Sequence, residues 1–207
     1  MNFLYFLCVS LARLTGKIVF SLKVEGREHM VQAGEGGTII AANHQSFLDP
    51  PFIAAAYKGE IHFLARDTLF TGLFGKLIAS VNAVPINQSG ADLASLKTII
   101  KEVKKGNRVL VFPEGTRSPD GELQSAAAGI GMIVAKSKAI VQPIYIDGAY
   151  DAWSRHQKRP SRAPITITFG ERLDFSDIDR IKSKEQYQEI ADTIMDRISA
   201  LKLQKEQ

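Results

Sequence analysis

From residue 36 onwards, short apolar runs alternate with stretches whose apolar residues recur at helical spacing. Thr38–Ala42 (TIIAA) and Arg108–Phe112 (RVLVF) are typical of buried strands, because each is a short, mainly apolar run close to glycine or proline. Ala91–Lys105 places its apolar residues on one helical face. This alternation of strands and helices predicts an α/β fold with a largely parallel central sheet flanked by helices.

The same pattern gives the bounds of each expected element. Strands are expected at Thr38–Ala42, Ile61–Leu64, Ala83–Ile86, Arg108–Phe112, Ile140–Ile146 and Ile165–Phe169. Helices are expected at Pro50–Tyr57, Thr68–Ser80, Ala91–Lys105, Ile130–Ala135 and Glu185–Leu203. The one long loop is expected at Ala149–Ala163.

The beginning of the chain is its most apolar segment. Phe3–Ala12 is almost entirely apolar, and Arg13 and Lys17 then interrupt the pattern. These charges disfavour a membrane-spanning helix, which needs about 20 consecutive apolar residues. No basic residue precedes the run, which disfavours a cleaved signal peptide. We therefore expect residues 1–22 to form a helical segment in a membrane interface, with basic side chains at anionic headgroups. The alternative is a terminal helix packed on the core of a domain formed by residues 23–207.

Composition and charge exclude several classes of protein. The 207 residues include a single cysteine, Cys8, which excludes an internal disulfide and a cysteine-rich zinc site. His29, His62 and His156 stand alone in the sequence, which disfavours a metal-dependent hydrolase, and no metal ion is expected. The net charge of +4 favours an anionic partner. Nucleic acid is disfavoured, because the basic residues of 155–162 form one short loop rather than a long stripe with interleaved aromatic residues.

A polar loop with a histidine and an aspartate follows the first predicted strand. It runs from Asn43 to Pro50 and places His44 near the carboxyl end of that strand, where ligands bind in open α/β sheets. In such a loop the Asp49 carboxylate can accept a hydrogen bond from Nδ1 of His44, which makes Nε2 available as a general base. In the alternative interpretation, Asp49 only caps the helix that begins at Pro50.

A second candidate loop, Phe112–Ser118, follows another predicted strand and is expected at the same edge of the sheet. Glu114 can accept a hydrogen bond from a substrate, and Gly115 lets a ligand approach the backbone. Thr116 can donate a hydrogen bond, and Arg117 can hold a phosphate with two parallel hydrogen bonds. The alternative is an ordinary polar turn.

Together the two loops resemble those of the glycerolipid acyltransferases, and especially of the bacterial 1-acyl-glycerol-3-phosphate acyltransferases. The first motif is His-x4-Asp, here His44 and Asp49, and the second is Phe-Pro-Glu-Gly-Thr-Arg-Ser, here Phe112–Ser118. The resemblance covers most of the chain, from about Lys23 to Leu173. It implies that His44, oriented by Asp49, is the catalytic base and that the second motif binds substrate.

The sequence departs from the family pattern in the block whose arginine is thought to hold the acceptor's phosphate. Relatives usually carry an Ile-Asp-Arg-like triplet after the third predicted strand, whereas Asn87 and Gln88 follow it here. Arg66 follows the second predicted strand, where relatives often have a lysine, and can compensate together with Arg117. The alternative for Arg66 is a solvated charge that pairs with Asp67.

The resemblance implies acyl transfer from a thioester to the free hydroxyl of 1-acylglycerol-3-phosphate, which yields phosphatidate. The thioester, acyl-CoA or acyl-carrier protein, is a co-substrate, and no separate cofactor is implied. Because acceptor and product reside in a bilayer, a monotopic protein on the cytoplasmic face of a bacterial inner membrane is expected. Two alternatives stay open: another lysophospholipid or amphiphile as the acceptor, and a non-catalytic lipid-binding protein with the same fold.

Overall fold

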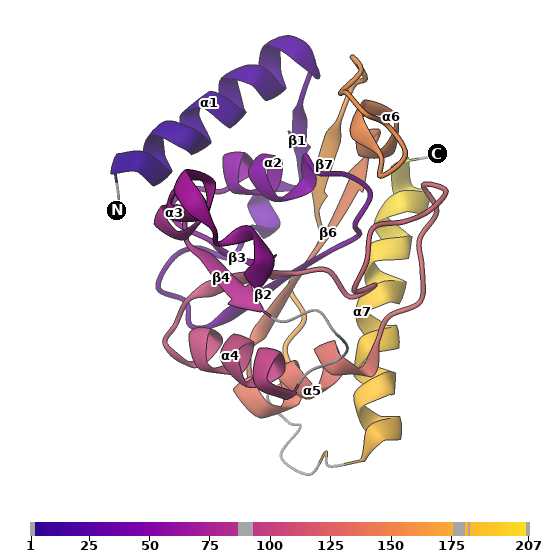
Figure 1. The fold of residues 1–207 in the computed structure, drawn as a ribbon. Helices are drawn as coiled ribbons and strands as arrows, with labels where there is room; N and C mark the ends of the chain where they lie inside the picture. The colour runs from indigo at the N-terminus through magenta and orange to yellow at the C-terminus, as the bar shows by residue number, and fades with distance from the viewer. Residues whose placement is uncertain (1–2, 87–92, 176–180, 182, 206–207) are drawn as a thin grey trace.

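The computed structural model describes residues 3–86, 93–175, 181 and 183–205, and its centre is a single sheet (Figure 1). The strands lie in the order β1-β7-β6-β2-β5-β3-β4. All neighbouring strands run parallel except β6 and β7, which are antiparallel, so the expected largely parallel sheet is confirmed. The strands are β1 (Lys23–Glu25), β2 (Thr38–Ala42), β3 (His62–Arg66), β4 (Ala83–Ile86), β5 (Arg108–Val111), β6 (Ile140–Asp147) and β7 (Thr166–Phe169).

Helices cover both faces of the sheet and give the domain three layers (Figure 1). α1 and α2 pack on one face, and α4, α5 and α7 pack on the other. The α-helices are α1 (Phe3–Val19), α2 (Asp49–Ala56), α3 (Gly72–Ser80), α4 (Leu93–Lys104), α5 (Ala128–Ser137), α6 (Ala149–Trp153) and α7 (Lys184–Lys205). Two short 3₁₀ helices, η1 (Arg27–His29) and η2 (Asp67–Leu69), complete the described elements.

The central strand β2 shows why the sheet must be covered on both sides. Ile40 and Ala42 belong to the core beneath α1 and α2, whereas Ile39 and Ala41 belong to the core beneath α4, α5 and α7. Successive side chains of a strand point to opposite faces, so a strand buried on both faces must be apolar at every position. This requirement explains the uninterrupted apolar run Ile39–Ala42, which follows the buried Thr38.

The parallel strands bring the loops of interest to one edge of the sheet. Ala41 of β2 is in register with Val111 of β5, so both strands end side by side. Beyond these ends, the backbone N–H of Ser118 donates a hydrogen bond of 2.7 Å to the carbonyl oxygen of His44. The expectation that the two candidate loops share one edge is therefore confirmed.

Several predicted strands and helices end one or two residues away from their expected bounds, and three elements differ by more than that. The expected loop at Ala149–Ala163 begins instead with α6, in which Ala149 and Ala152 are buried. The expected helix at Thr68–Ser80 is divided, because η2 ends at Leu69 and α3 begins only at Gly72, which has a positive φ of 60°. β1 was not predicted: it has three residues and is stabilised by parallel pairing with the distant strand β7.

The N-terminal helix α1 has one packed side and one exposed side. Tyr5 and Gly16 are buried, and the Arg13 guanidinium donates hydrogen bonds to the carbonyl oxygen of Ala55 in α2. The exposed large apolar residues of α1 are Phe3, Phe6, Leu7, Leu11, Leu14 and Ile18. Within the described ranges, no helix combines the length and the apolar character needed to cross a bilayer. α1 is therefore packed on the core along one side, whereas its other side exposes a row of apolar side chains.

Candidate active site

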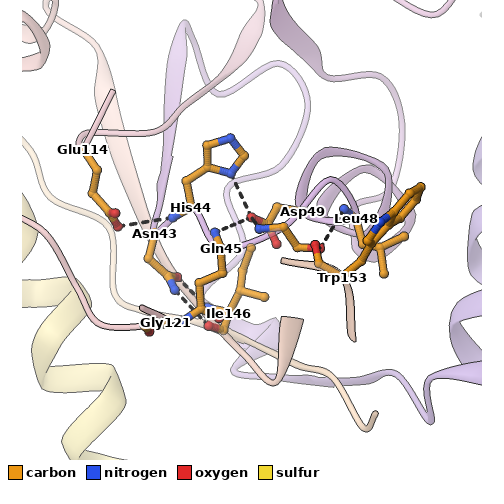
Figure 2. A network of polar contacts seen from close by, with 10 residues as sticks. Asn43, His44, Gln45, Leu48, Asp49, Glu114, Gly121, Ile146 and Trp153 are labelled. Carbon is orange, nitrogen blue, oxygen red and sulfur yellow. Dashed lines mark hydrogen bonds and ion pairs between the residues drawn. The ribbon is translucent and has the colours of Figure 1, made fainter. Parts of the chain in front are cut away.

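His44 and Asp49 form a hydrogen-bonded pair at the carboxyl end of β2 (Figure 2). Nδ1 of His44 lies 2.8 Å from Oδ2 of Asp49. The His44 side chain is 18% exposed and that of Asp49 is 0% exposed, so substrate can reach the imidazole but not the carboxylate. Among the described residues, Nε2 of His44 makes no hydrogen bond. The pair therefore holds a proton on Nδ1 and leaves Nε2 as a base.

Backbone donors fix the Asp49 carboxylate from a second direction. Its Oδ2 also accepts hydrogen bonds of 2.7 Å from the backbone N–H groups of Gln45 and Ser46. Asp49 is the first residue of α2, Leu48 is the N-cap residue, and the helix start has no side-chain cap. The interpretation of Asp49 as a simple helix cap is therefore wrong, since its carboxylate points back into the loop that carries His44.

Two polar side chains anchor this loop to the neighbouring strand β6 and to α6. The Asn43 amide donates to the carbonyl oxygen of Ile146 at 2.9 Å and accepts from the Ile146 N–H at 2.7 Å (Figure 2). The Ser46 hydroxyl donates to the carbonyl oxygen of Trp153 at 2.8 Å. Because Asn43 and Ser46 are fully buried, these bonds are shielded from water and hold the loop in one conformation.

The second loop supports His44 from β5. The Phe112 ring stacks on the imidazole with 3.8 Å between ring centroids and an angle of 9° between planes. Oε1 of Glu114 accepts a hydrogen bond of 3.2 Å from the backbone N–H of His44 (Figure 2). The structure thus places Glu114 against the His44 backbone, and its expected contact with substrate stays a prediction.

Glu114 lies in an environment that disfavours its charge. Burial, the largest cause, and the nearby negative charge of Asp49 raise the pKa of Glu114 to about 7, although the hydrogen bond from the His44 backbone lowers it. Oε2 of Glu114 is buried and makes no hydrogen bond with any described residue. Near neutral pH this carboxyl group can therefore either donate or accept a hydrogen bond.

Gly115, Thr116 and Arg117 of the second motif lie closer to the surface than the buried Glu114. Gly115 and Thr116 are exposed, and Gly115 has a φ of 71°, which favours glycine. The Arg117 guanidinium carbon lies 3.6 Å from the centroid of the Phe47 ring, and Phe47 contacts Trp153 at 5.3 Å between ring centroids. Arg117 is thus held over an aromatic ring of the loop that carries His44.

Other arginines lie near Arg117. Burial, followed by the positive charges of Arg155 and Arg66, lowers the pKa of Arg117, which stays protonated at neutral pH. Arg66 is exposed at the end of β3, so the structure brings this predicted site residue to the same edge. Asn87 and Gln88, the expected departure from the family pattern, lie outside the described residues.

Comparisons with known proteins identify the family. A family model described as Acyltransferase matches residues 21–147. The chain belongs to this acyltransferase family. The acyltransferase is 26% identical to the 1-acyl-sn-glycerol-3-phosphate acyltransferase of Bacillus subtilis (strain 168), over 96% of both chains. It is 32% identical to the protein of that name from Pseudomonas aeruginosa, over 62% of this chain and 52% of the relative.

A solved structure shares the fold of this acyltransferase. The crystal structure of the 1-acyl-sn-glycerophosphate (LPA) acyltransferase, PlsC, from Thermotoga maritima superimposes with a TM-score of 0.76 and 25% sequence identity. The match covers 96% of this chain and 80% of that chain. The resemblance expected from the two sequence motifs is therefore confirmed by family model, relatives and fold.

The geometry of the acyltransferase suits proton abstraction from a hydroxyl group. An imidazole with Nδ1 bound to a carboxylate can take a proton at Nε2, and the carboxylate then stabilises the imidazolium that forms. Among the described residues, no group of three or more His, Cys, Asp or Glu side chains is placed to hold a metal ion.

Sequence reasoning missed several contacts of the acyltransferase site. Phe112 was expected at the end of a strand and at the start of the second motif, but its stacking on His44 was not predicted. The packing of Phe47 with Trp153 was not predicted either. The Phe112 contact depends on the pairing of β5 with β2, which brings the residue after Val111 beside the residues after Ala41, and no pattern in the sequence indicates that pairing.

Proposed function

We propose that the protein transfers a fatty acyl group from a thioester to the free hydroxyl of 1-acylglycerol-3-phosphate and so produces phosphatidate. The observation that supports this best is the His44–Asp49 hydrogen bond of 2.8 Å at the edge of the sheet that also carries Arg117. The names of the relatives from Bacillus subtilis and Pseudomonas aeruginosa agree with this reaction.

The proposed reaction needs no covalent intermediate on the protein. Nε2 of His44 takes the proton of the acceptor hydroxyl while the hydroxyl oxygen bonds to the thioester carbon. The carbon–sulfur bond then breaks, the acyl group stays on the acceptor oxygen, and the thiolate takes the proton from the imidazolium. A thiol has a pKa near ~8.5, so the leaving group needs little help from an acid.

The acceptor's headgroup is held by positive charge beside the base. In this proposal Arg117 and Arg66 bind the phosphate, while Gly115 and Thr116 contact the glycerol portion. Fixing the headgroup places the free hydroxyl next to Nε2 of His44, and such positioning contributes much of the rate in reactions of two bound molecules. The donor is acyl-CoA or acyl-carrier protein, and no separate cofactor or metal ion takes part.

We further propose that α1 lies in the membrane interface, so that residues 1–22 act as an anchor for the domain of residues 23–207. The exposed apolar side of α1 supports this, as does the exposed basic residue Lys17 on the same helix. The protein then works as a monotopic enzyme on the cytoplasmic face of the membrane that holds acceptor and product.

A panel of acceptors tests this function. Purified protein is given one acyl-CoA, and thiol release is measured with lysophosphatidate, lysophosphatidylcholine, lysophosphatidylethanolamine and monoacylglycerol. We expect the largest kcat/KM with lysophosphatidate. A preference for another lysophospholipid would support the second candidate, acylation of a different acceptor, which the Asn87-Gln88 departure favours. No thiol release with any of these acceptors, with acyl-CoA or with acyl-carrier protein as the donor in a repeat of the panel, would support a non-catalytic lipid-binding protein.

A further inference from the structure

The loop after α6 brings an additional arginine to the proposed headgroup site. Arg155 lies on this loop, and its Nη1 donates a hydrogen bond of 3.2 Å to the backbone carbonyl oxygen of Arg117. Within the described part of the chain, neither Arg155 nor Arg117 forms an ion pair with a carboxylate. Nη1 of Arg155 therefore lies against the backbone of Arg117, close enough for the two positive charges to repel each other. The carboxylate that acts on Arg117 is that of Asp49, which is already hydrogen-bonded to His44.

The position of Arg155 is fixed by contacts on both sides of it. Before it, the carbonyl oxygen of Trp153 accepts the Ser46 hydroxyl at 2.8 Å, which connects α6 to the loop of His44. After it, Nε2 of His156 lies 2.9 Å from the carbonyl oxygen of Pro119. Arg155 is thus held between the two catalytic loops, although its own side chain is exposed.

An anion of more than one charge fits this arrangement. A guanidinium has five N–H donors, and the structure commits only Nη1 of Arg155, so the others are available to a ligand. Like charges held together repel each other, and a bound anion removes that repulsion. A phosphomonoester carries about −1.5 to −2 charges at neutral pH, whereas a phosphodiester carries only about −1.

We propose that Arg155 is a specificity-determining residue that binds the phosphomonoester of the acceptor together with Arg117. This inference rests on the proposed function and deepens it.

The test compares Arg155→Gln with the matched control Arg159→Gln. Both variants remove one exposed arginine from the same loop, but Arg159 makes no hydrogen bond to the Arg117–Pro119 turn. The acceptor is a short-chain, water-soluble 1-acylglycerol-3-phosphate, first without vesicles and then with anionic vesicles. The assay without vesicles reports binding of the acceptor's phosphate alone, and the second assay reveals any effect of membrane headgroups. Thiol release gives kcat and KM for each variant, and the melting temperature confirms that each is folded.

We expect Arg155→Gln to raise the KM for this acceptor about tenfold with little change in kcat, because a charge-assisted hydrogen bond to phosphate is lost. Arg159→Gln should keep the wild-type KM. The preference for lysophosphatidate over monoacylglycerol should fall by the same factor in Arg155→Gln. Arg155→Lys keeps the charge and should give an intermediate KM, so the proposal stays testable if the glutamine variant fails to fold.

Two results would overturn the proposal. One is an equal KM in Arg155→Gln and Arg159→Gln while the wild-type protein still acylates lysophosphatidate, which leaves the proposed function intact. The other is an effect of Arg155→Gln that appears only with anionic vesicles, which would assign the arginine to the membrane surface. Failure of the wild-type protein itself to prefer the phosphorylated acceptor would instead contradict the proposed function.

Discussion

The Phe112 ring lies flat against the imidazole of His44, with 3.8 Å between centroids and 9° between planes. This contact joins the two sequence motifs, since Phe112 begins one and His44 belongs to the other. The Asp49 hydrogen bond fixes one edge of the imidazole, and the Phe112 ring fixes its plane. The direction of Nε2 is thus set by two residues, and each can be tested separately.

Replacing Phe112 by leucine removes the flat surface but keeps an apolar side chain of similar volume. We expect kcat to fall about three- to tenfold, because an aromatic pair contributes about 0.5–1.5 kcal/mol beyond its buried area. The KM for the acceptor should change little, and Phe112→Tyr should restore kcat. Steady-state kinetics of the three proteins measures this, and a change in KM alone would show that Phe112 contacts substrate instead.

Replacing Asp49 by asparagine tests the orientation of the base. The amide cannot accept three hydrogen bonds on a charged oxygen and no longer stabilises the imidazolium, so kcat should fall by roughly 10²–10⁴-fold. Asp120→Asn makes the same chemical change in an exposed turn and should keep nearly full activity. Comparable losses in both variants would contradict a special role for Asp49.

Glu114 makes the stability of the protein depend on pH. Burial raises its pKa from an ordinary 4.5 to about 7, so the folded protein binds this proton more tightly than the unfolded chain. Its contribution to stability is complete below about pH 4.5 and is lost as the pH rises through about 7. Glu114→Gln resembles the protonated form, so its free energy of unfolding should rise relative to wild type across this range. Denaturant unfolding at several pH values measures the difference, and a constant difference would contradict the raised pKa.

The exposed side of α1 predicts binding to lipid. The double substitution Leu11→Gln and Leu14→Gln should weaken sedimentation with anionic vesicles about tenfold or more without lowering the melting temperature, because both side chains are already exposed in solution. Leu203→Gln on α7 is a matched control, since Leu203 is 56% exposed, compared with 59% for Leu11 and 55% for Leu14. Unchanged vesicle binding of the double variant would contradict the proposed anchor.

The sequence predicted best those elements whose pattern is local. β2 and β4 have the predicted bounds, because short apolar runs beside turn residues identify them without knowledge of their neighbours. β1 has only three residues and is stabilised by pairing with β7, which lies more than a hundred residues away in the sequence. Its own residues show no strand pattern, so the sequence does not predict it. α6 has only five residues and follows Gly148 in a left-handed conformation, and its alanines are buried by the tertiary structure.

In the candidate site, too, the sequence predicted the local contact but not the contacts between distant segments. The His44–Asp49 contact was predicted because both residues lie in one loop. The stacking of Phe112 and the approach of Arg155 depend on the strand order β6-β2-β5. In this order β6 lies on one side of β2, the strand that leads to His44, and β5 lies on the other side. No periodicity in one sequence reveals that order, so these contacts emerged only from the structure.

The turnover of His44→Ala with acyl-CoA and lysophosphatidate, measured as thiol release, tests the central claim most directly. A protein that uses His44 as its general base should lose roughly 10²–10⁴-fold in kcat at a melting temperature close to that of wild type. His29→Ala, a change at a histidine outside the site, should keep wild-type turnover. Wild-type turnover in a folded His44→Ala protein would contradict the account.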